Sequence, residues 1–270
     1  MASNNTSNDQ KISVATLTNV PETMLIPLYL KAKETLENGL INDEKAVEIV
    51  NRIDYDFKKF DKDENALIGV VVRTFLFDKI LQDLYEKVGG SLVVVNLGAG
   101  LDTRQVRFPN IKWYQLDLPE SIEIRRRFFT EGNPTLIAKS ILDFSWIDDI
   151  AEKENVLFIG EGLFMYFEEE DVKSIFKNIG TRFTRSYMVF NPVPKPMVGA
   201  RHKIVDSSKA PMLWGIMSLK EIFDWNAGWV EAISYFPPDY FKKRWEGMSP
   251  LILLPEARKA FVIALLETEK

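Results

Sequence analysis

The sequence predicts an α/β fold in which helices cover both faces of a mostly parallel β-sheet. Three observations lead to this prediction. After Gly90, five apolar, β-branched or aromatic runs alternate with helical segments, a pattern typical of parallel strands. Two later apolar runs, at 229–236 and 259–267, are expected to close the sheet as an antiparallel pair. The stretch before Gly90 reads as helical, so we expect a helical N-terminal cap on the same domain.

The N-terminal part is expected to contain three helices after a disordered tail at residues 1–20, where the chain is polar. Apolar residues at helical spacing, candidate N-caps and a stop at Gly89 support these helices. The predicted helices and their candidate N-caps are 21–36 with Thr23, 42–53 with Asn42 and 63–90 with Asp63.

The second part alternates strands and helices. The predicted strands are 92–98, 111–117, 135–141, 155–162 and 185–192. The predicted helices between them are 102–107, 119–130, 145–153 and 168–179. Asp102 and Ser145 are candidate helix starts, and Pro119 suits a first helical position. We therefore expect one domain over residues 21–270, divided into a cap at 21–90 and a sheet core at 91–270.

Composition excludes several classes of site. The chain of 270 residues has no cysteine and one histidine, which excludes disulfides, cysteine nucleophiles, Cys-ligated zinc and His-rich metal sites. A net charge of −5 argues against nucleic acid as a partner. No apolar run reaches the ~20 residues of a membrane span, and no signal pattern is present. We expect a cytoplasmic protein that needs no metal.

Gly98 and Gly100 stand directly after the first predicted strand of the sheet. Glycine there permits a sharp turn and lets a ligand approach the backbone closely. A dinucleotide site would need a third glycine, where this chain has Thr103, and the charge of Asp102 would repel a pyrophosphate. The pattern favours a nucleoside cofactor without phosphates, and a NAD-dependent dehydrogenase is a distant alternative.

Asp117 ends the second predicted strand, seventeen residues after Gly100. An acidic side chain at this place can accept hydrogen bonds from both ribose hydroxyls. Together with Gly98 and Gly100, Asp117 therefore predicts S-adenosylmethionine (SAM) as the cofactor. A tight turn followed by a surface aspartate is the alternative.

Three stretches carry a family resemblance: NLGAGLDTR (96–104), WYQLDLPE (113–120) and LFIGEGLFMYF (157–167). In this order they resemble the leucine carboxyl methyltransferase superfamily of SAM-dependent methyltransferases. The N-terminal VPETMLIPLYLKAKET (20–35) is similar to the branch related to tetracenomycin-type polyketide O-methyltransferases. The resemblance runs from about residue 18 to 180. It implies a class I methyltransferase, Rossmann-like sheet of seven strands whose last strand is antiparallel.

The resemblance also implies residues for the methionine part of SAM. Arg73 matches the family arginine that holds the carboxylate, and an arginine among apolar residues does need an anionic partner. An internal ion pair with Asp78 or Asp117 is the alternative. Glu161 could bind the ammonium group, or act as a cap or backbone ligand. Lys31 replaces a family arginine and could reach the carboxylate or lie on the helix surface.

For the nucleoside part, the resemblance implies Asp143 for the adenine amine, Phe144 for its ring and Leu118 as a further contact. An N-cap before the following helix is the alternative for Asp143. Asn96 departs from the family, because this position is often acidic in SAM enzymes.

The acceptor determinants are expected in an insertion at 193–225, which is long for a connection. The candidate contacts are Met197, Arg201, Met212 and Trp214. A helix packed on the core with solvated charges is the alternative for this segment. Tyr166 and His202 are candidate catalytic residues, each with a purely structural alternative.

The predicted function is O-methylation of a small molecule at a carboxylate, with S-adenosylhomocysteine (SAH) as product. A carboxylate is ionised at pH 7 and needs no base, whereas a phenol usually does. Residues 21–60 are expected to cover the cofactor as a lid. The alternatives are methylation of a protein C-terminal carboxylate and a non-catalytic SAM-binding regulator. A homodimer is possible because the apolar helix at 63–88 could pack within the chain or across a dimer.

Overall fold

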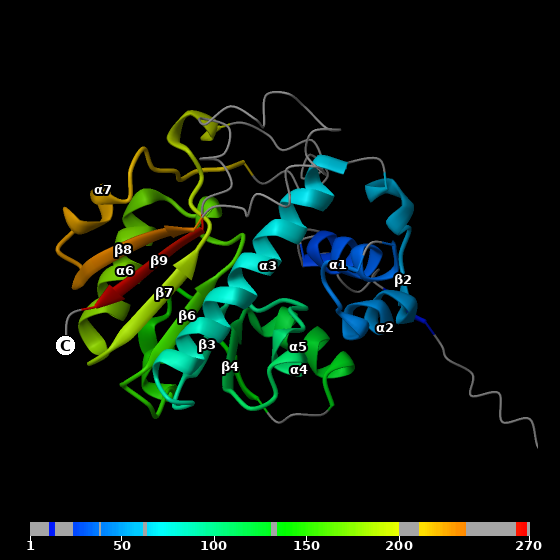
Figure 1. Ribbon diagram of the computed structural model, residues 1–270, viewed down its shortest axis with the longest axis horizontal. Helices are drawn as coiled ribbons and strands as arrows, with labels where there is room; N and C mark the ends of the chain where they lie inside the picture. Colours follow the sequence, from blue (N-terminus) through cyan, green and yellow to red (C-terminus); the bar gives the residue numbers. More distant parts are fainter. Residues whose placement is uncertain are drawn as a thin grey trace, which may run out of the picture.

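A computed structural model describes the chain over the ranges 11–13, 24–37, 39–61, 64–130, 134–199, 211–235 and 263–268, with backbone only at 13, 64, 65 and 231. Within these ranges the chain forms one seven-stranded sheet and a separate two-stranded ladder (Figure 1). Helices lie on both faces of the large sheet.

The large sheet is mostly parallel. Its strands in spatial order are β5 (Thr135–Ala138), β4 (Lys112–Asp117), β3 (Val93–Leu97), β6 (Val156–Gly160), β7 (Ser186–Phe190), β9 (Ile263–Thr268) and β8 (Trp229–Tyr235). Among the described strands, β9 runs antiparallel to both of its neighbours, β7 and β8, which confirms the predicted closing antiparallel pair. The chain moves from β3 outward to β4 and β5 and then returns to place β6 on the other side of β3. The carboxyl ends of β3 and β6 therefore flank a topological switch point, where open α/β sheets bind ligands.

Alternation along the strands divides the core into two layers. Val94 of β3 packs with α3 (Glu64–Lys87), whereas Val93 and Val95 pack with α6 (Glu169–Arg182) on the opposite face. Side chains of a strand point alternately to its two faces, so one apolar run fills both layers. α5 (Pro119–Phe128) joins the α3 layer through Ile124 and Phe128.

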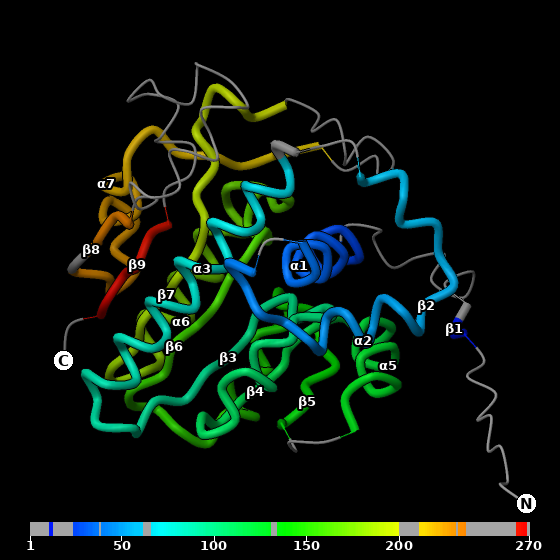
Figure 2. Tube along the Cα trace, turned by 45° about the vertical axis from the view of Figure 1, so that its right-hand side comes forward, coloured from blue at the N-terminus to red at the C-terminus, as the bar shows by residue number. Residues whose placement is uncertain are grey.

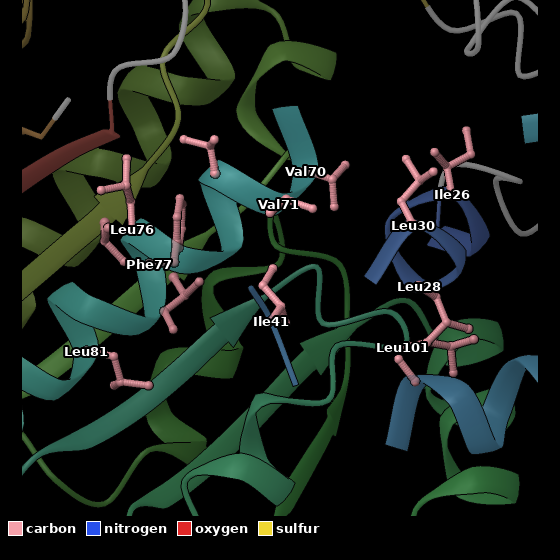
Figure 3. Packing of buried hydrophobic residues seen from close by; sticks show 14 of the residues in the cluster. Ile26, Leu28, Leu30, Ile41, Val70, Val71, Leu76, Phe77, Leu81 and Leu101 are labelled. Atoms are coloured by element: carbon pink, nitrogen blue, oxygen red, sulfur yellow. The ribbon is translucent and has the colours of Figure 1, made fainter. Parts of the chain in front are cut away.

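The N-terminal helices pack on the α3 side of the sheet. α1 (Leu25–Glu37) contacts both α2 (Glu44–Arg52) and α3, and Figure 2 shows it between them. Leu28 and Leu30 of α1 share a buried cluster with Val71 of α3 and with Leu101, the residue after Gly100 (Figure 3). Burial of these apolar side chains fixes the cap against the loop that follows β3.

Several element boundaries differ from the sequence prediction. The N-cap of α2 is Asp43 rather than Asn42, because the Asp43 carboxylate accepts a hydrogen bond from the Ala46 N–H. The predicted helix at 102–107 starts later, as α4 (Arg104–Arg107). The predicted helix at 145–153 is a short 3₁₀ turn, η4 (Phe144–Asp149), because burial of Trp146 and Ile147 directs the chain into the α6 layer.

The predicted tail is described only at 11–13. There Ile12–Ser13 forms β1, which pairs in parallel with β2 (Ile53–Asp54), so this piece of the expected tail is a strand. The candidate caps Thr23 and Asp63 lie outside the described residues.

Candidate functional site

The loop after β3 meets the end of β4. Gly98 and Gly100 have φ values of 65° and 45°, in the left-handed region that favours glycine. The Gly100 N–H donates to the Asp117 carboxylate at 2.7 Å, and the Leu118 N–H donates to its other oxygen at 2.7 Å. Burial raises the pKa of Asp117, and these N–H donors oppose that shift only in part. The loop and Asp117 therefore form one hydrogen-bonded unit.

Arg125 of α5 also binds the loop after β3. Its buried guanidinium donates to the Gly100 carbonyl at 3.0 Å and to the Gln105 side-chain oxygen at 2.7 Å. It also lies over the Phe129 ring, 4.1 Å from the centroid. Burial lowers the pKa of Arg125 to about 10. Arg125 therefore fixes the loop through the Gly100 carbonyl, while the Ala99 and Asp102 N–H groups donate to the carbonyls of Leu116 and Ala99.

Arg73 and Glu161 come together at the switch point. Arg73 lies on α3 and Glu161 directly follows β6, and Arg73 Nε donates to Glu161 Oε1 at 2.7 Å. The alternative interpretation of Arg73 as part of an internal ion pair is met by Glu161, whereas Asp78 and Asp117 do not pair with Arg73 among the described ion pairs. A Cβ on Gly162 would lie 3.7 Å from Arg73 Nη1, so the missing side chain leaves the guanidinium uncovered on that side.

Arg104 connects Glu161 to the loop after β3. It is 1% exposed, and its Nη1 atom lies 2.5 Å from Glu161 Oε2 and 2.8 Å from Asp102 Oδ2. Its Nε atom donates to Asp78 of α3 at 2.7 Å. Lys31 of α1 completes the group at 3.5 Å from Asp102. Lys31 is 4% exposed, so the prediction that it could lie on the helix surface is wrong.

The ion pairs decide which carboxylates carry charge. Burial alone would raise the pKa of Glu161, but Arg104 and Arg73 outweigh burial and lower it to about 2. Arg104 and Lys31 likewise outweigh burial at Asp102 and hold its pKa well below the usual range. Both carboxylates are therefore ionised at neutral pH.

The candidate adenine contacts lie at the ends of β4 and β5. Asp143 is exposed and caps η4 by accepting from the Ser145 N–H at 3.2 Å, which is the structural alternative noted for it. Phe144 is half-buried against the α6 layer. Leu118, which follows Asp117 at the end of β4, is 49% exposed.

The acceptor-side candidates separate into three groups. Met197 is 39% exposed and Met212 is half-buried, and the two flank a backbone bond from Gly199 N–H to the Met212 carbonyl at 2.9 Å. Trp214 is only 2% exposed and packs against Phe176 and Phe190, so it belongs to the core rather than to an accessible acceptor surface. The candidates Arg201 and His202 lie outside the described residues.

Tyr166 ends a 3₁₀ turn, η5 (Phe164–Tyr166), that is joined to the acceptor side. The carbonyl of Met165 in this turn accepts from the Leu213 N–H at 2.7 Å. Burial raises the pKa of Tyr166, and the nearby Arg73 opposes this shift. Tyr166 therefore stays protonated at neutral pH and is poorly suited to act as a base.

Arg104, Asp43 and Arg125 were not predicted as parts of the site, and Asp78 was considered only as a possible partner of Arg73. Arg104 was visible inside NLGAGLDTR, but its partners come from elements far away in the sequence. Within the described ranges, no cluster of acidic residues or histidines is suited to hold a metal ion. No helix in the described part of the chain is long and apolar enough to cross a membrane.

Comparisons with known proteins show the family of this chain. The family model described as "Leucine carboxyl methyltransferase" matches residues 28–180. The tetracenomycin polyketide synthesis O-methyltransferase TcmP of Streptomyces glaucescens is 27% identical over 207 residues, covering 74% of this chain and 76% of TcmP. The S-adenosyl-L-methionine-dependent methyltransferase dpfgK of Gibberella zeae is 27% identical over 190 residues, covering 63% of this chain and 64% of dpfgK.

Solved structures show the same fold. A proposed methyltransferase from Thermobifida fusca superimposes with a TM-score of 0.56 at 16% identity, covering 89% of this chain and 94% of that one. A DUF574-family protein from Streptomyces avermitilis gives a TM-score of 0.57 at 11% identity, covering 92% of this chain and 97% of that one. These likenesses confirm the predicted fold class.

Proposed function

Because this chain belongs to the leucine carboxyl methyltransferase family and is therefore a methyltransferase, we propose that it methylates a carboxylate oxygen of a small molecule. The observation that carries the proposal is the arrangement of three charged groups around the switch point: Asp117 binds the loop after β3, and Arg73 pairs with Glu161 directly after β6. Each has a charge or hydrogen-bonding capacity that matches a part of SAM.

The donor set fits SAM part by part. In the proposed arrangement Asp117 accepts from the ribose hydroxyls, and the uncovered side of Arg73 pairs with the methionine carboxylate. Glu161, ionised by its arginine partners, accepts from the ammonium group. Leu118 and Phe144 offer apolar surface to the adenine, and Asp143 an acceptor for its amine. SAM would supply the methyl group already activated on a sulfonium.

The charged groups of the site favour a carboxylate as acceptor. Glu161 and Asp102 have pKa values lowered by ion pairs, which makes them weak bases. Tyr166, with a raised pKa, does not become a base near pH 7. A phenol with a pKa of about 10 would need a base that these described groups do not supply, whereas a carboxylate needs none. The main work of the chain is then to align the acceptor oxygen with the methyl group and to exclude water.

The first test is cofactor binding. Calorimetry on the purified protein should show that SAM and SAH bind one to one, while NADH does not bind. Arg73→Ala should weaken SAH binding about tenfold or more, since it removes a charge-assisted contact. Lys79→Ala is the matched control, because Lys79 lies exposed on the same helix. Equal affinity of Arg73→Ala and wild type would remove the proposed role of Arg73.

The second test identifies the acceptor. Methyl-labelled SAM is offered with a panel of small carboxylic acids and phenols, and with peptides that end in a free carboxylate. Methyl esters release volatile methanol in mild alkali and methyl ethers do not, so the proposal expects alkali-labile label in the small-molecule fraction. Alkali-stable label would indicate a phenol acceptor, and label in the peptides would indicate the protein carboxyl methyltransferase. SAM binding without transfer to any acceptor would favour a regulator.

A further inference from the structure

Arg104 touches more charged groups of the site than its position on a four-residue helix suggests. Its guanidinium contacts Asp78 on α3, Asp102 in the loop after β3 and Glu161 after β6. It also lies over the ring of Phe77, 5.3 Å from the centroid. The side chain is almost completely buried, so water cannot replace these contacts.

We propose that Arg104 is a positioning residue that sets Glu161 and Asp102 at the two sides of the switch point for the amino-acid end of SAM. This inference rests on the proposed function. A single guanidinium atom of Arg104, Nη1, lies 2.8 Å from Asp102 and 2.5 Å from Glu161. The two carboxylates come from loops after different strands, and Arg104 is the described side chain that pairs with both.

The proposal needs arginine and not merely a positive charge. Nε is committed to Asp78 while Nη1 serves the other two carboxylates, a division that the planar guanidinium allows and a single ammonium does not. Nη2 is buried without a hydrogen-bond partner among the described residues. The bond to Asp78 anchors the guanidinium on α3, and from there Nη1 contacts the carboxylates of both loops.

Among the groups around Arg104, Glu161 should be affected most when Arg104 is replaced. The charges that face it are Arg73 from α3, Lys31 from α1, Asp102 from the loop after β3 and Arg104 itself. Without Arg104, Glu161 loses one of the two arginines that lower its pKa. Burial and repulsion from Asp102, which both raise that pKa, remain. Glu161 would then take up a proton at mildly acidic pH and stop accepting from the cofactor ammonium.

The test is calorimetric SAH affinity between pH 5 and 8. Wild type should bind SAH with nearly constant affinity across this range as far as Glu161 is concerned, because Glu161 stays ionised from pH 5 to 8. Arg104→Gln should bind about tenfold more weakly at pH 8, with a further loss as the pH falls to 5. Arg104→Lys should also bind SAH more weakly than wild type. It replaces Arg104→Gln in the test if Arg104→Gln does not fold. Adding Glu161→Gln to Arg104→Gln should abolish the extra pH dependence, since the titrating group is gone.

Arg107→Lys is the control variant. Arg107 lies on the same short helix and pairs with Asp78, but it contacts neither Glu161 nor Asp102 within 4.0 Å. It should retain the flat pH profile of wild type. If wild type binds SAH but Arg104→Lys and Arg104→Gln, folded by circular dichroism, match it at every pH, the inference is overturned and the proposed function stands. If wild type itself does not bind SAH, the proposed function fails first.

Discussion

At the scale of single residues, burial and ion pairing compete at each carboxylate of the site. At Asp117 burial dominates and raises the pKa, because the opposing groups are chiefly two backbone N–H donors and Arg125 contributes least. Glu161 is also buried, but two guanidinium groups reverse the effect and its pKa falls to about 2. Two carboxylates of one site therefore have pKa values shifted in opposite directions. The direction depends on whether close charged partners outweigh burial.

Glu161 should make the protein sensitive to acid. Because its folded-state pKa lies below its ordinary value of 4.5, its ionised form stabilises the fold above about pH 4.5. This stabilisation, roughly 3 kcal/mol at most, is lost as the pH falls toward 2. Urea unfolding at pH 3 to 7 should show a shallower acid loss for Glu161→Gln than for wild type. Glu170→Gln, an exposed change on α6, should keep the wild-type slope, and a Glu161→Gln slope equal to it would contradict the argument.

Local motifs predicted some of these residues and not others, for a physical reason. Asp117 and Gly100 could be paired from the sequence because each ends or follows a strand, and parallel strands end at one edge of the sheet. Arg104 could not, because its partners depend on how α3 crosses the sheet, which no spacing in the sequence encodes. Trp214 was assigned to the acceptor surface by its apolar neighbours alone, yet a buried aromatic cluster is equally apolar.

At the scale of elements, a close backbone contact holds α6 to the turn before β8. A Cβ built on Gly180, near the end of α6, would lie 1.9 Å from the carbonyl oxygen of Ala227. Trp229, at the start of β8, donates its indole N–H to the Phe176 carbonyl at 3.1 Å and reinforces the same contact. Backbone faces backbone here, so no side-chain rearrangement can make room for a larger residue.

Gly180→Ala should therefore destabilise the protein although alanine is the better helix former. We expect a loss of roughly 1–3 kcal/mol in the free energy of unfolding, because overpacking outweighs the propensity gain of about 1 kcal/mol. Ser174→Ala, exposed on the same helix, should be neutral or slightly stabilising. Chemical denaturation of both variants beside wild type measures the difference. Equal stability of the two variants would mean that the turn at Ala227 can move away.

Element ends were harder to predict than elements. Asn42 and Asp43 are both good N-caps, and the choice was made by a tertiary contact, since Asp43 also accepts from the Thr103 hydroxyl and pairs with Lys31. The helix expected at 145–153 is short because Trp146 donates its indole N–H back to the Ile141 carbonyl and is fully buried. Both outcomes depend on neighbours that lie outside the local sequence.

At the scale of the whole molecule, the charged site joins layers that are distant in sequence. Lys31 belongs to α1, Asp78 to α3, Asp102 to the loop after β3 and Glu161 to the end of β6. The alternation of strands and helices was enough to predict the sheet, whereas the docking of the N-terminal helices onto it was expected only from the need to cover the cofactor. A ligand that binds these groups should therefore tie the cap and the sheet together.

SAH should stabilise the molecule unevenly. At a free concentration one hundred times its dissociation constant, it should add about 2.7 kcal/mol to the free energy of unfolding and raise the melting temperature by about 5–10 °C. Hydrogen exchange should slow most in α1 and around Gly98 and Gly100, because Lys31 and the loop share the charged site. Exchange in β8 should change least, since β8 lies at the far edge of the sheet.

The same experiment separates binding at the switch point from general stabilisation. Arg73→Ala at an equal SAH concentration should show a smaller rise in melting temperature, since its ion pair with Glu161 and its contact with the ligand are both lost. NADH should give no rise for either protein. Uniform slowing of exchange across α1 and β8 would indicate that SAH suppresses only global unfolding. Slowing confined to α1 and the glycine loop would mean that the ligand closes a local opening between the cap and the sheet, as the Lys31–Asp102 contact leads us to expect.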